Sequence, residues 1–470
     1  MAALAADRRH SCQTFVVSRR EAHYFNSLLS NFAGLWSFTA GDPMAIGQQT
    51  GLMSVADAVP GGAMAAVAER APVQPAAVTQ PFVLAAGQRE LRLDLFRGLA
   101  LWLIYIDHVS PDLLTWFTIR NYGFSDAAEI FIFISGFTAA LVYGRATFET
   151  GIVVGTARVI RRVWQIYTAH LLLFLVLMAE IAYVTAVSGK QFYVQEMVVG
   201  DFFKEPGAVM IQALLLRFRP LNMDVLPLYV VLMCTLPVVL LLAKWKRDLP
   251  LVLSIVLYIL TNRYDLHFST FPEGFWSFNP FAWQLLFVFG AWCALGGARS
   301  LRPIVASPIT FWVAVAYLCA AFLLTMTWYF PQLEHLVPDW LARWIYPINK
   351  TDFDILRFAH FLALAVVGLR FVPPGWAGLR SPWMQPLILC GQYSLQIFAL
   401  GVALSFAGYA FLMEVDAGVA LHFIVGAAGI LVLYGVARTF TWYKKITAGK
   451  ARGRTAATPA AAPALTSEGS

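Results

Sequence analysis

The chain has few charged residues for its length. Asp, Glu, Lys and Arg make up 13% of its 470 residues, whereas about 25% is usual in soluble domains. Hydrophobic residues account for 59% and aromatic residues for 14%. Because polar side chains are too few to cover a globule of this size, lipid must solvate much of the surface. The composition excludes an ordinary soluble domain and indicates a polytopic membrane protein.

Cysteine is also scarce. The five Cys residues lie at scattered spacings without a CxxC motif, which predicts neither a disulfide framework nor a metal site. The net charge of +7 would suggest nucleic acid in a soluble protein, but here Lys and Arg cluster between apolar segments. Basic flanks of that kind set membrane orientation, so we expect no nucleic-acid partner.

The two ends of the chain lack a sustained hydrophobic period, which predicts disorder for residues 1–87 and for a tail over residues 441–470. Residues 88–440 form the predicted transmembrane domain. About ten apolar segments there approach the ~20 residues of a membrane-spanning helix. They are approximately Leu93–Val109, Ala127–Tyr143, Val163–Val184, Leu226–Ala243, Leu249–Leu260, Pro280–Leu295, Ile309–Phe330, Ile355–Leu369, Pro386–Ala410 and Val419–Ala437. The shorter stretch Gly207–Leu216 predicts an interfacial or re-entrant helix.

Charges in the loops predict the orientation. If the N-terminus is cytoplasmic, the inner loops contain basic clusters such as Arg158, Arg161 and Arg162, and the outer loops collect acids such as Asp265 and Glu273. This is the positive-inside pattern. We therefore predict an all-α polytopic integral membrane protein with about ten transmembrane helices and both termini cytoplasmic.

The first span contains ionisable residues, which are costly in a membrane and mark a function or an internal pair. In RLDLFRGLALWLIYIDHVS, Asp94, Arg97 and His108 fall on one stripe, because Arg97 and His108 are almost three turns, about 16 Å, apart. A histidine can take a proton from a hydroxyl at neutral pH, and the adjacent Asp107 can orient it. His108 is therefore a candidate general base. The alternative is a hydrogen-bonded interfacial histidine.

Two further motifs each allow a structural and a functional interpretation. In GFSDAAEIFIFISGF, Asp126 and Glu129 have the spacing of a helix capping box, and Glu129 could also orient His108. In RVIRR, Arg158 and Arg161 could clamp a phosphate-bearing ligand. Boundary arginines are equally the ordinary mark of a cytoplasmic flank.

A third constellation lies in NKTDFDILRFAHFLALA, where Asp354, Arg357 and His360 follow one another at helical spacing. These residues could form a second wall of the site. They could equally form a buried ion pair that fixes helix packing.

Several long motifs occur together in the order found in a known family. The segments RLDLFRGLALWLIYIDHVS, GFSDAAEIFIFISGF, NMDVLPLYVVLM, FNPFAWQLLFVFG and LRFAHFLALA resemble the membrane domain of the OpgC family, over about residues 88–440. That family is similar to membrane acyltransferases of the acyltransferase-3 type. Arg97 and His108 match an Arg and His spacing of that type, and Arg158 and Arg161 match its RxxR pair.

The resemblance implies a multi-pass enzyme of the bacterial inner membrane. Such an enzyme moves an acyl group, typically succinyl, from cytoplasmic acyl-coenzyme A to hydroxyls of an osmoregulated periplasmic glucan. It implies acyl-coenzyme A as donor substrate, with membrane lipid and a saccharide acceptor as partners, and no tightly bound cofactor. Expected catalytic residues are His108, Asp107 and Glu129, and expected substrate-binding residues are Asp94, Arg97, Asp126, Arg158, Arg161, Arg357 and His360.

Other functions remain compatible with the same residues. A transporter or flippase of a saccharide or lipid would use them as a proton relay or pathway. An O-acetyltransferase would act on another envelope polysaccharide. A structural subunit of an envelope complex would use the charges only as pairs between helices. The acyl group, the acceptor and the oligomeric state are left open by the sequence.

Overall fold

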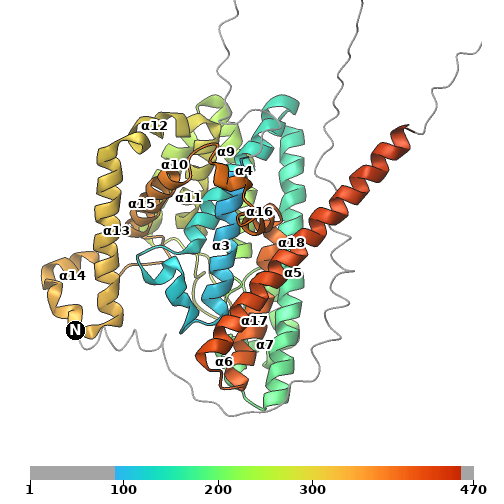
Figure 1. Ribbon diagram of the computed structural model, residues 1–470, viewed down its shortest axis with the longest axis vertical. Coiled ribbons are helices and arrows are strands. Elements are labelled where there is room, and N and C mark those ends of the chain that lie inside the picture. The colour runs from blue at the N-terminus through green and yellow to red at the C-terminus, as the bar shows by residue number, and fades with distance from the viewer. Residues whose placement is uncertain (1–89, 457–470) are drawn as a thin grey trace, which may run out of the picture. The chain divides into compact units, whose positions relative to one another are not determined.

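The computed structural model describes residues 90–456, and the described residues form helices and loops without a named strand. The predicted disorder of residues 1–87 and of 457–470 falls outside this range. Helix α18 (Val419–Ala456) continues through the first part of the tail predicted from residue 441. Ala, Lys and Arg are frequent there and are good helix formers, so the helix persists beyond its apolar part. Its C-terminal part extends away from the other helices (Figure 1).

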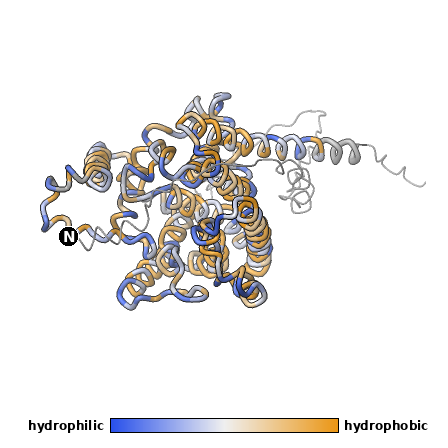
Figure 2. The backbone as a smooth tube through the Cα atoms, turned by 90° about the horizontal axis from the view of Figure 1, so that it is seen from below, coloured by the Kyte–Doolittle hydropathy of each residue, from blue (hydrophilic) through white to orange (hydrophobic). Residues whose placement is uncertain are grey.

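Seven helices within the described residues are long and apolar enough to cross a membrane. They are α4 (Ala127–Thr150), α5 (Ile152–Ser188), α9 (Val225–Trp245), α11 (Pro280–Trp292) with its continuation η4 (Cys293–Gly297) and α12 (Ala298–Ala306), α13 (Pro308–Tyr329), α17 (Ser394–Glu414) and α18. Hydrophobic residues predominate along these helices, and hydrophilic residues are more frequent in the loops that connect them (Figure 2). This is a polytopic helical membrane protein.

Three further predicted spans are also helical. Helix α3 (Leu91–Val109) includes several charged residues, and α10 (Leu249–Tyr264) and α15 (Ile355–Phe371) contain 16 and 17 residues. These lengths fall short of the ~20 residues of an untilted span. The total of about ten spans therefore stays a prediction.

The remaining elements are short. They are η2 (Leu114–Phe117), η3 (Ile119–Asn121), α6 (Phe192–Glu196), α7 (Gly200–Lys204), α8 (Pro206–Leu214), η5 (Pro331–Leu336), α14 (Asp339–Ile345), η6 (Ala377–Arg380) and α16 (Gln385–Gln392). Helix α8 confirms a short helix in the stretch Gly207–Leu216. A side-chain amide joins two of the spans, because Gln284 of α11 accepts a hydrogen bond from the Ser254 hydroxyl of α10 at 2.6 Å.

Glycine allows two helix pairs to approach closely. A side chain at Gly98 of α3 would collide with the Leu387 carbonyl of α16, and one at Gly391 would collide with the Asp94 carbonyl. Helices α4 and α11 form a second such contact, where Gly136 meets the Phe287 carbonyl. Small residues at such crossings let helices associate in lipid, where the hydrophobic effect gives little drive. The contacts hold α3 and α4 in the interior.

One predicted span, Pro386–Ala410, is interrupted, and another, Pro280–Leu295, ends at a break in its helix. Helices α16 and α17 are separated at Tyr393, and the helix that begins with α11 leaves helical geometry at Leu295 and Gly296. Gly296 has φ of +103°, a conformation that glycine adopts without steric cost. Buried residues make up 78% of the most apolar stretch of the α11 helix, against 17% for α18. Helix α11 is therefore interior, and α18 leaves most of its apolar surface uncovered by the other described helices.

Candidate active site

The C-terminal end of α3 and the N-terminal ends of α4 and α15 lie at one end of the helices, called here the His108 end. Ion pairs between α4 and α15 establish this arrangement, because Arg357 contacts both Asp126 and Glu129. Asp107 and His108 on α3 lie within electrostatic range of Asp126. The structure thus brings together candidate residues from three helices that are distant in sequence.

His108 is half-buried and held by its own helix. Its Nδ1 lies 2.6 Å from the Ile104 carbonyl oxygen. A carbonyl can only accept, so Nδ1 carries the proton and Nε2 keeps its lone pair in the neutral ring. Among residues 90–456 His108 forms no other hydrogen bond. The ring is therefore fixed in the tautomer that a general base needs, with Nε2 as the accepting atom.

Asp107 has a separate partner. The Thr118 hydroxyl donates to its Oδ1 at 2.6 Å, and the residue is 5% exposed. Thr118 also donates to the Thr115 carbonyl at 2.9 Å, so the connection between α3 and α4 wraps over this carboxyl. Asp107 therefore places a carboxylate at the His108 end, but it is not hydrogen-bonded to the His108 imidazole ring.

Helix α4 begins with the predicted capping box. The Ala128 backbone N–H donates to Asp126 Oδ1 at 2.8 Å, and the Asp126 backbone N–H donates to Glu129 Oε2 at 2.9 Å. These bonds satisfy N–H groups that the first helical turn leaves unpaired. One oxygen of each carboxylate remains, and both face α15. In each of these carboxylates, one oxygen forms the capping box and the other is available for a contact outside α4.

Arg357 occupies those remaining oxygens. Its Nε donates to Glu129 Oε1 at 2.8 Å, and its Nη2 lies 2.6 Å from the same oxygen and 3.4 Å from Asp126 Oδ2. Glu129 is completely buried and Arg357 is 8% exposed. A buried charge needs such a partner because desolvation is costly. Glu129 thus binds Arg357 and the Asp126 backbone instead of orienting His108 through a hydrogen bond.

Lys350 adds a second cation. Its Nζ lies 2.6 Å from Asp126 Oδ2, and its side chain is 45% exposed. Burial would raise the pKa of Asp126, but Lys350 and Arg357 outweigh it and hold that pKa well below its usual range. Asp126 is therefore ionised and bridges the two cations.

Sequence reasoning did not single out Lys350 or Arg120. Both lie within electrostatic range of His108. A usable signal was present, since each is a basic residue in a loop predicted to be outside, where the positive-inside rule expects few. The loop with Lys350 is anchored from α11, because Trp283 Nε1 donates to the Lys350 carbonyl at 3.0 Å.

Within the Asp354, Arg357 and His360 triplet, Arg357 and His360 contact the start of α4, whereas Asp354 contacts its own helix. Asp354 caps α15 by accepting from the Leu356 backbone N–H at 2.8 Å. His360 Nδ1 lies 2.7 Å from the Ser125 hydroxyl and accepts from the Ser125 backbone N–H at 3.3 Å. His360 is 2% exposed, which makes it a positioning group for the start of α4.

Arg97 lies deeper, about two turns into α3. Its Nη2 donates to the Ile134 carbonyl at 3.2 Å and to the Thr138 hydroxyl. Both partners lie about two and three full turns into α4, which places Arg97 below the His108 end. Asp94 is buried one turn before it, beside the close contact with Gly391.

Arg158 and Arg161 lie at the opposite end. They belong to the first turns of α5, which follows α4 directly after Gly151. Arg158 is half-buried and Arg161 is exposed. The structure thus separates these arginines from the His108 end by the length of α4, as the sequence predicts. Within residues 90–456 no group of His, Cys, Asp or Glu is arranged to hold a metal ion.

The fold and this buried constellation define a polytopic helical membrane protein with a polar site at one end. A family model described as OpgC protein matches residues 89–445, and the chain belongs to this family. Membership indicates an acyltransferase-like role in glucan modification. Comparison with curated proteins and with solved structures gave no match.

Proposed function

We propose that the protein is an O-acyltransferase that moves a succinyl group from cytoplasmic acyl-coenzyme A to a hydroxyl of a periplasmic glucan. In this proposal about ten helices span the bacterial inner membrane, both termini are cytoplasmic, and the His108 end faces the periplasm. One observation carries the proposal. His108 holds its Nδ1 proton on the Ile104 carbonyl, which leaves Nε2 free to accept a proton beside a cluster of buried charges.

In the proposed reaction His108 Nε2 takes the proton of the acceptor hydroxyl as its oxygen attacks the thioester carbonyl carbon. A C–O bond forms, the C–S bond breaks, and the coenzyme A thiolate leaves and is protonated. Asp126 lies within electrostatic range of His108 and counteracts part of the repulsion that Arg120 and Lys350 exert on the imidazolium that forms. Asp107 is the neighbouring residue on α3 and contacts Thr118. Glu129 contributes by holding Arg357, which in turn binds Asp126.

The donor would approach from the opposite end. Arg158 and Arg161 lie there on α5 and suit the phosphates of coenzyme A, which arginine binds well. Arg97 lies between the two ends, about 16 Å from His108 along α3, with Asp94 next to it. We propose that this path carries the acyl thioester toward His108.

The charge near His108 supports an anionic acyl group. Lys350 and Arg120 both act on His108 electrostatically, and Lys350 is half-exposed. The distal carboxylate of succinyl would interact favourably with Arg120, whereas Lys350 is already paired with Asp126. Acetyl has no charge with which to use Arg120. Asp126, Arg357 and His360 form the side of the site behind these cations, and we propose that succinyl rather than acetyl is the group transferred.

The test is mass spectrometry of periplasmic glucans from a strain without the gene, complemented with wild type or with His108→Ala. We expect succinyl adducts only with wild type, with both proteins equally abundant in the membrane. His335→Ala changes an exposed histidine and should retain transfer. Adducts at wild-type level with His108→Ala would refute the role of His108. Unchanged glucan masses in the deletion strain would refute the acceptor, and acetyl adducts would favour an O-acetyltransferase.

A transporter or flippase is the second candidate, and the interrupted helices favour it. The breaks at Tyr393 and Gly296 are of the kind found at midplane binding sites of transporters. The two functions differ in one measurement. Membranes that contain an acyltransferase consume succinyl-coenzyme A when acceptor is supplied, and membranes that contain only a transporter do not.

A further inference from the structure

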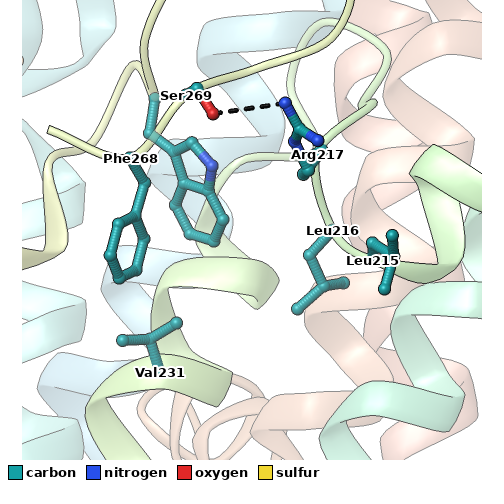
Figure 3. A pocket seen from close by; sticks show the side chains of 7 residues that line it. Leu215, Leu216, Arg217, Val231, Phe268 and Ser269 are labelled. Atoms are coloured by element: carbon teal, nitrogen blue, oxygen red, sulfur yellow. Dashed lines mark hydrogen bonds between the residues drawn. The ribbon is translucent and has the colours of Figure 1, made fainter.

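A cavity separate from the His108 site opens between the segment that joins α8 to α9 and the loop that follows α10 (Figure 3). Its volume is ≈ 290 Å³, the lower end of the ~300–1,000 Å³ usual for small-molecule sites. It is lined by Leu215, Leu216, Arg217, Val231, Phe268, Ser269 and Trp276. The size suits one small ring, and the lining is mainly apolar with a few polar groups, as in most ligand sites.

The polar groups of the cavity have unused hydrogen-bonding capacity. Arg217 Nη2 donates to the Ser269 hydroxyl at 3.3 Å (Figure 3), which leaves its other N–H groups for a ligand. Trp276 is 5% exposed, and its Nε1 is buried without a hydrogen-bond partner. An unsatisfied buried donor is uncommon and needs an explanation. A hydroxyl in the cavity that Trp276 lines would provide the missing acceptor.

The indole ring is held rigidly. Arg219 stacks over it at 4.4 Å from the ring centroid, and Phe268 packs edge-on against it at 5.5 Å. The Nε atom of Arg219 donates to Asp224 Oδ1 at 2.9 Å, so the charge of Arg219 is neutralised within the protein. An aromatic surface whose backing cation is already neutralised is preorganised for a ligand that presents an apolar face to it.

The loop that lines the cavity is hydrogen-bonded to the loop that carries Lys350 of the candidate active site. The loop that carries Phe268 and Trp276 ends at Asn279, whose Nδ2 donates to Asp352 Oδ1 at 2.9 Å and whose backbone N–H donates to the Thr351 carbonyl at 3.0 Å. Thr351 follows Lys350, which binds Asp126. The cavity and the His108 site therefore share one set of loops at the same end of the helices.

We propose that this cavity is a saccharide subsite that binds one neutral pyranose ring of the acceptor, away from the hydroxyl that reacts. The inference rests on the proposed function, which supplies a glucan as acceptor. A pyranose has an apolar C–H face that suits Phe268 and Trp276, and hydroxyls that suit Trp276 Nε1, Arg217 and Ser269. Binding there positions a longer acceptor while another of its rings reacts at His108.

The test uses the full-length protein in detergent, with succinyl-coenzyme A as donor and either glucose or longer gluco-oligosaccharides as acceptor. Trp276→Phe keeps the aromatic ring and removes the N–H, and Arg217→Gln changes an exposed residue with little risk to folding. We expect the KM for long acceptors to rise about fivefold to tenfold in each variant, the effect of losing one hydrogen bond. The KM for donor, the KM for glucose and kcat should not change.

The matched control is Trp442→Phe, which changes an indole that is 61% exposed on α18 and should leave every constant unaltered. An equal rise in KM for glucose and for long acceptors would overturn the subsite, as would no rise at all. Loss of a co-purified phospholipid in Trp276→Phe, seen by native mass spectrometry, would assign the cavity to lipid instead. Absence of any transfer by wild type would refute the proposed function, and the subsite with it.

Discussion

The ion pair between Arg357 and Glu129 gives the sharpest test of how the site is held. Glu129 is fully buried and receives two contacts from Arg357, at 2.8 and 2.6 Å. Arg357→Met removes the cation and leaves the carboxylate buried with only the Asp126 backbone N–H at its other oxygen. The substitution keeps a long apolar side chain at that position, so the change is mainly one of charge.

Breaking a buried pair by removing one partner costs about 3–5 kcal/mol. At about 2 °C per kcal/mol, the low end of the scaling for chains of 150–250 residues, the unfolding temperature should fall by about 6–10 °C. Removing both charges in Arg357→Met with Glu129→Gln should recover most of that loss, because uncharged replacements of a buried pair are often nearly neutral. The coupling between the two sites is the quantity measured.

The assay is thermal unfolding of the purified protein in detergent, for wild type, both single variants and the double variant. Arg263→Met is the matched control, because Arg263 is exposed at the end of α10 and should change stability by no more than about 0.5 kcal/mol. The reasoning fails if Arg357→Met costs no more than this control. It also fails if the losses in the two single variants simply add in the double variant.

Two further predictions concern packing and pH. Gly98→Ala should lower the unfolding temperature and the amount of protein in the membrane, because its Cβ would collide with the Leu387 carbonyl and overpacking costs about 1–3 kcal/mol. Gly435→Ala, where a Cβ meets open space, should not, and equal effects would contradict the helix contact. Asp126 has a folded-state pKa below its unfolded value of about 3.9. Its stabilisation is therefore complete above about pH 5, declines progressively below about pH 4, and is lost only as pH falls through the lower folded-state pKa; Asp126→Asn should flatten the dependence of unfolding temperature on pH below about pH 4.

Most of the helical architecture could be predicted from the sequence, because apolar length marks the seven helices that are long enough to cross a membrane. The capping box at Asp126 and Glu129 was also predictable, since it depends on residues three apart. The role of Arg357 was open, because the spacing of Asp354, Arg357 and His360 allows either a wall of the site or a buried ion pair. The structure shows that Arg357 forms buried ion pairs with Asp126 and Glu129.

Other parts of the site depend on contacts that local patterns do not encode. Lys350 and Asp126 are 224 positions apart, and neither an apolar period nor a motif links them. The cavity at Trp276 is formed by two loops, whose paths are set by bonds such as that between Asn279 and Asp352. Helix α18 extends to Ala456, beyond its apolar part, because residues with high helix propensity follow the hydrophobic stretch.

The polar groups at the His108 end are of two kinds: charged groups that are already paired with one another, and His108, whose Nε2 atom has no hydrogen-bond partner among the described residues. Asp126, Glu129, Arg357 and Lys350 neutralise one another, so a proton taken up by either carboxylate would break ion pairs that hold α4 against α15. These paired groups are therefore poorly suited to carry a proton and well suited to hold the two helices together. His108 has its Nδ1 satisfied by its own helix and its Nε2 lone pair unused, so protonation of this ring breaks no bond. Substitutions in the cluster should therefore act first on stability, and substitution of His108 should act on transfer alone.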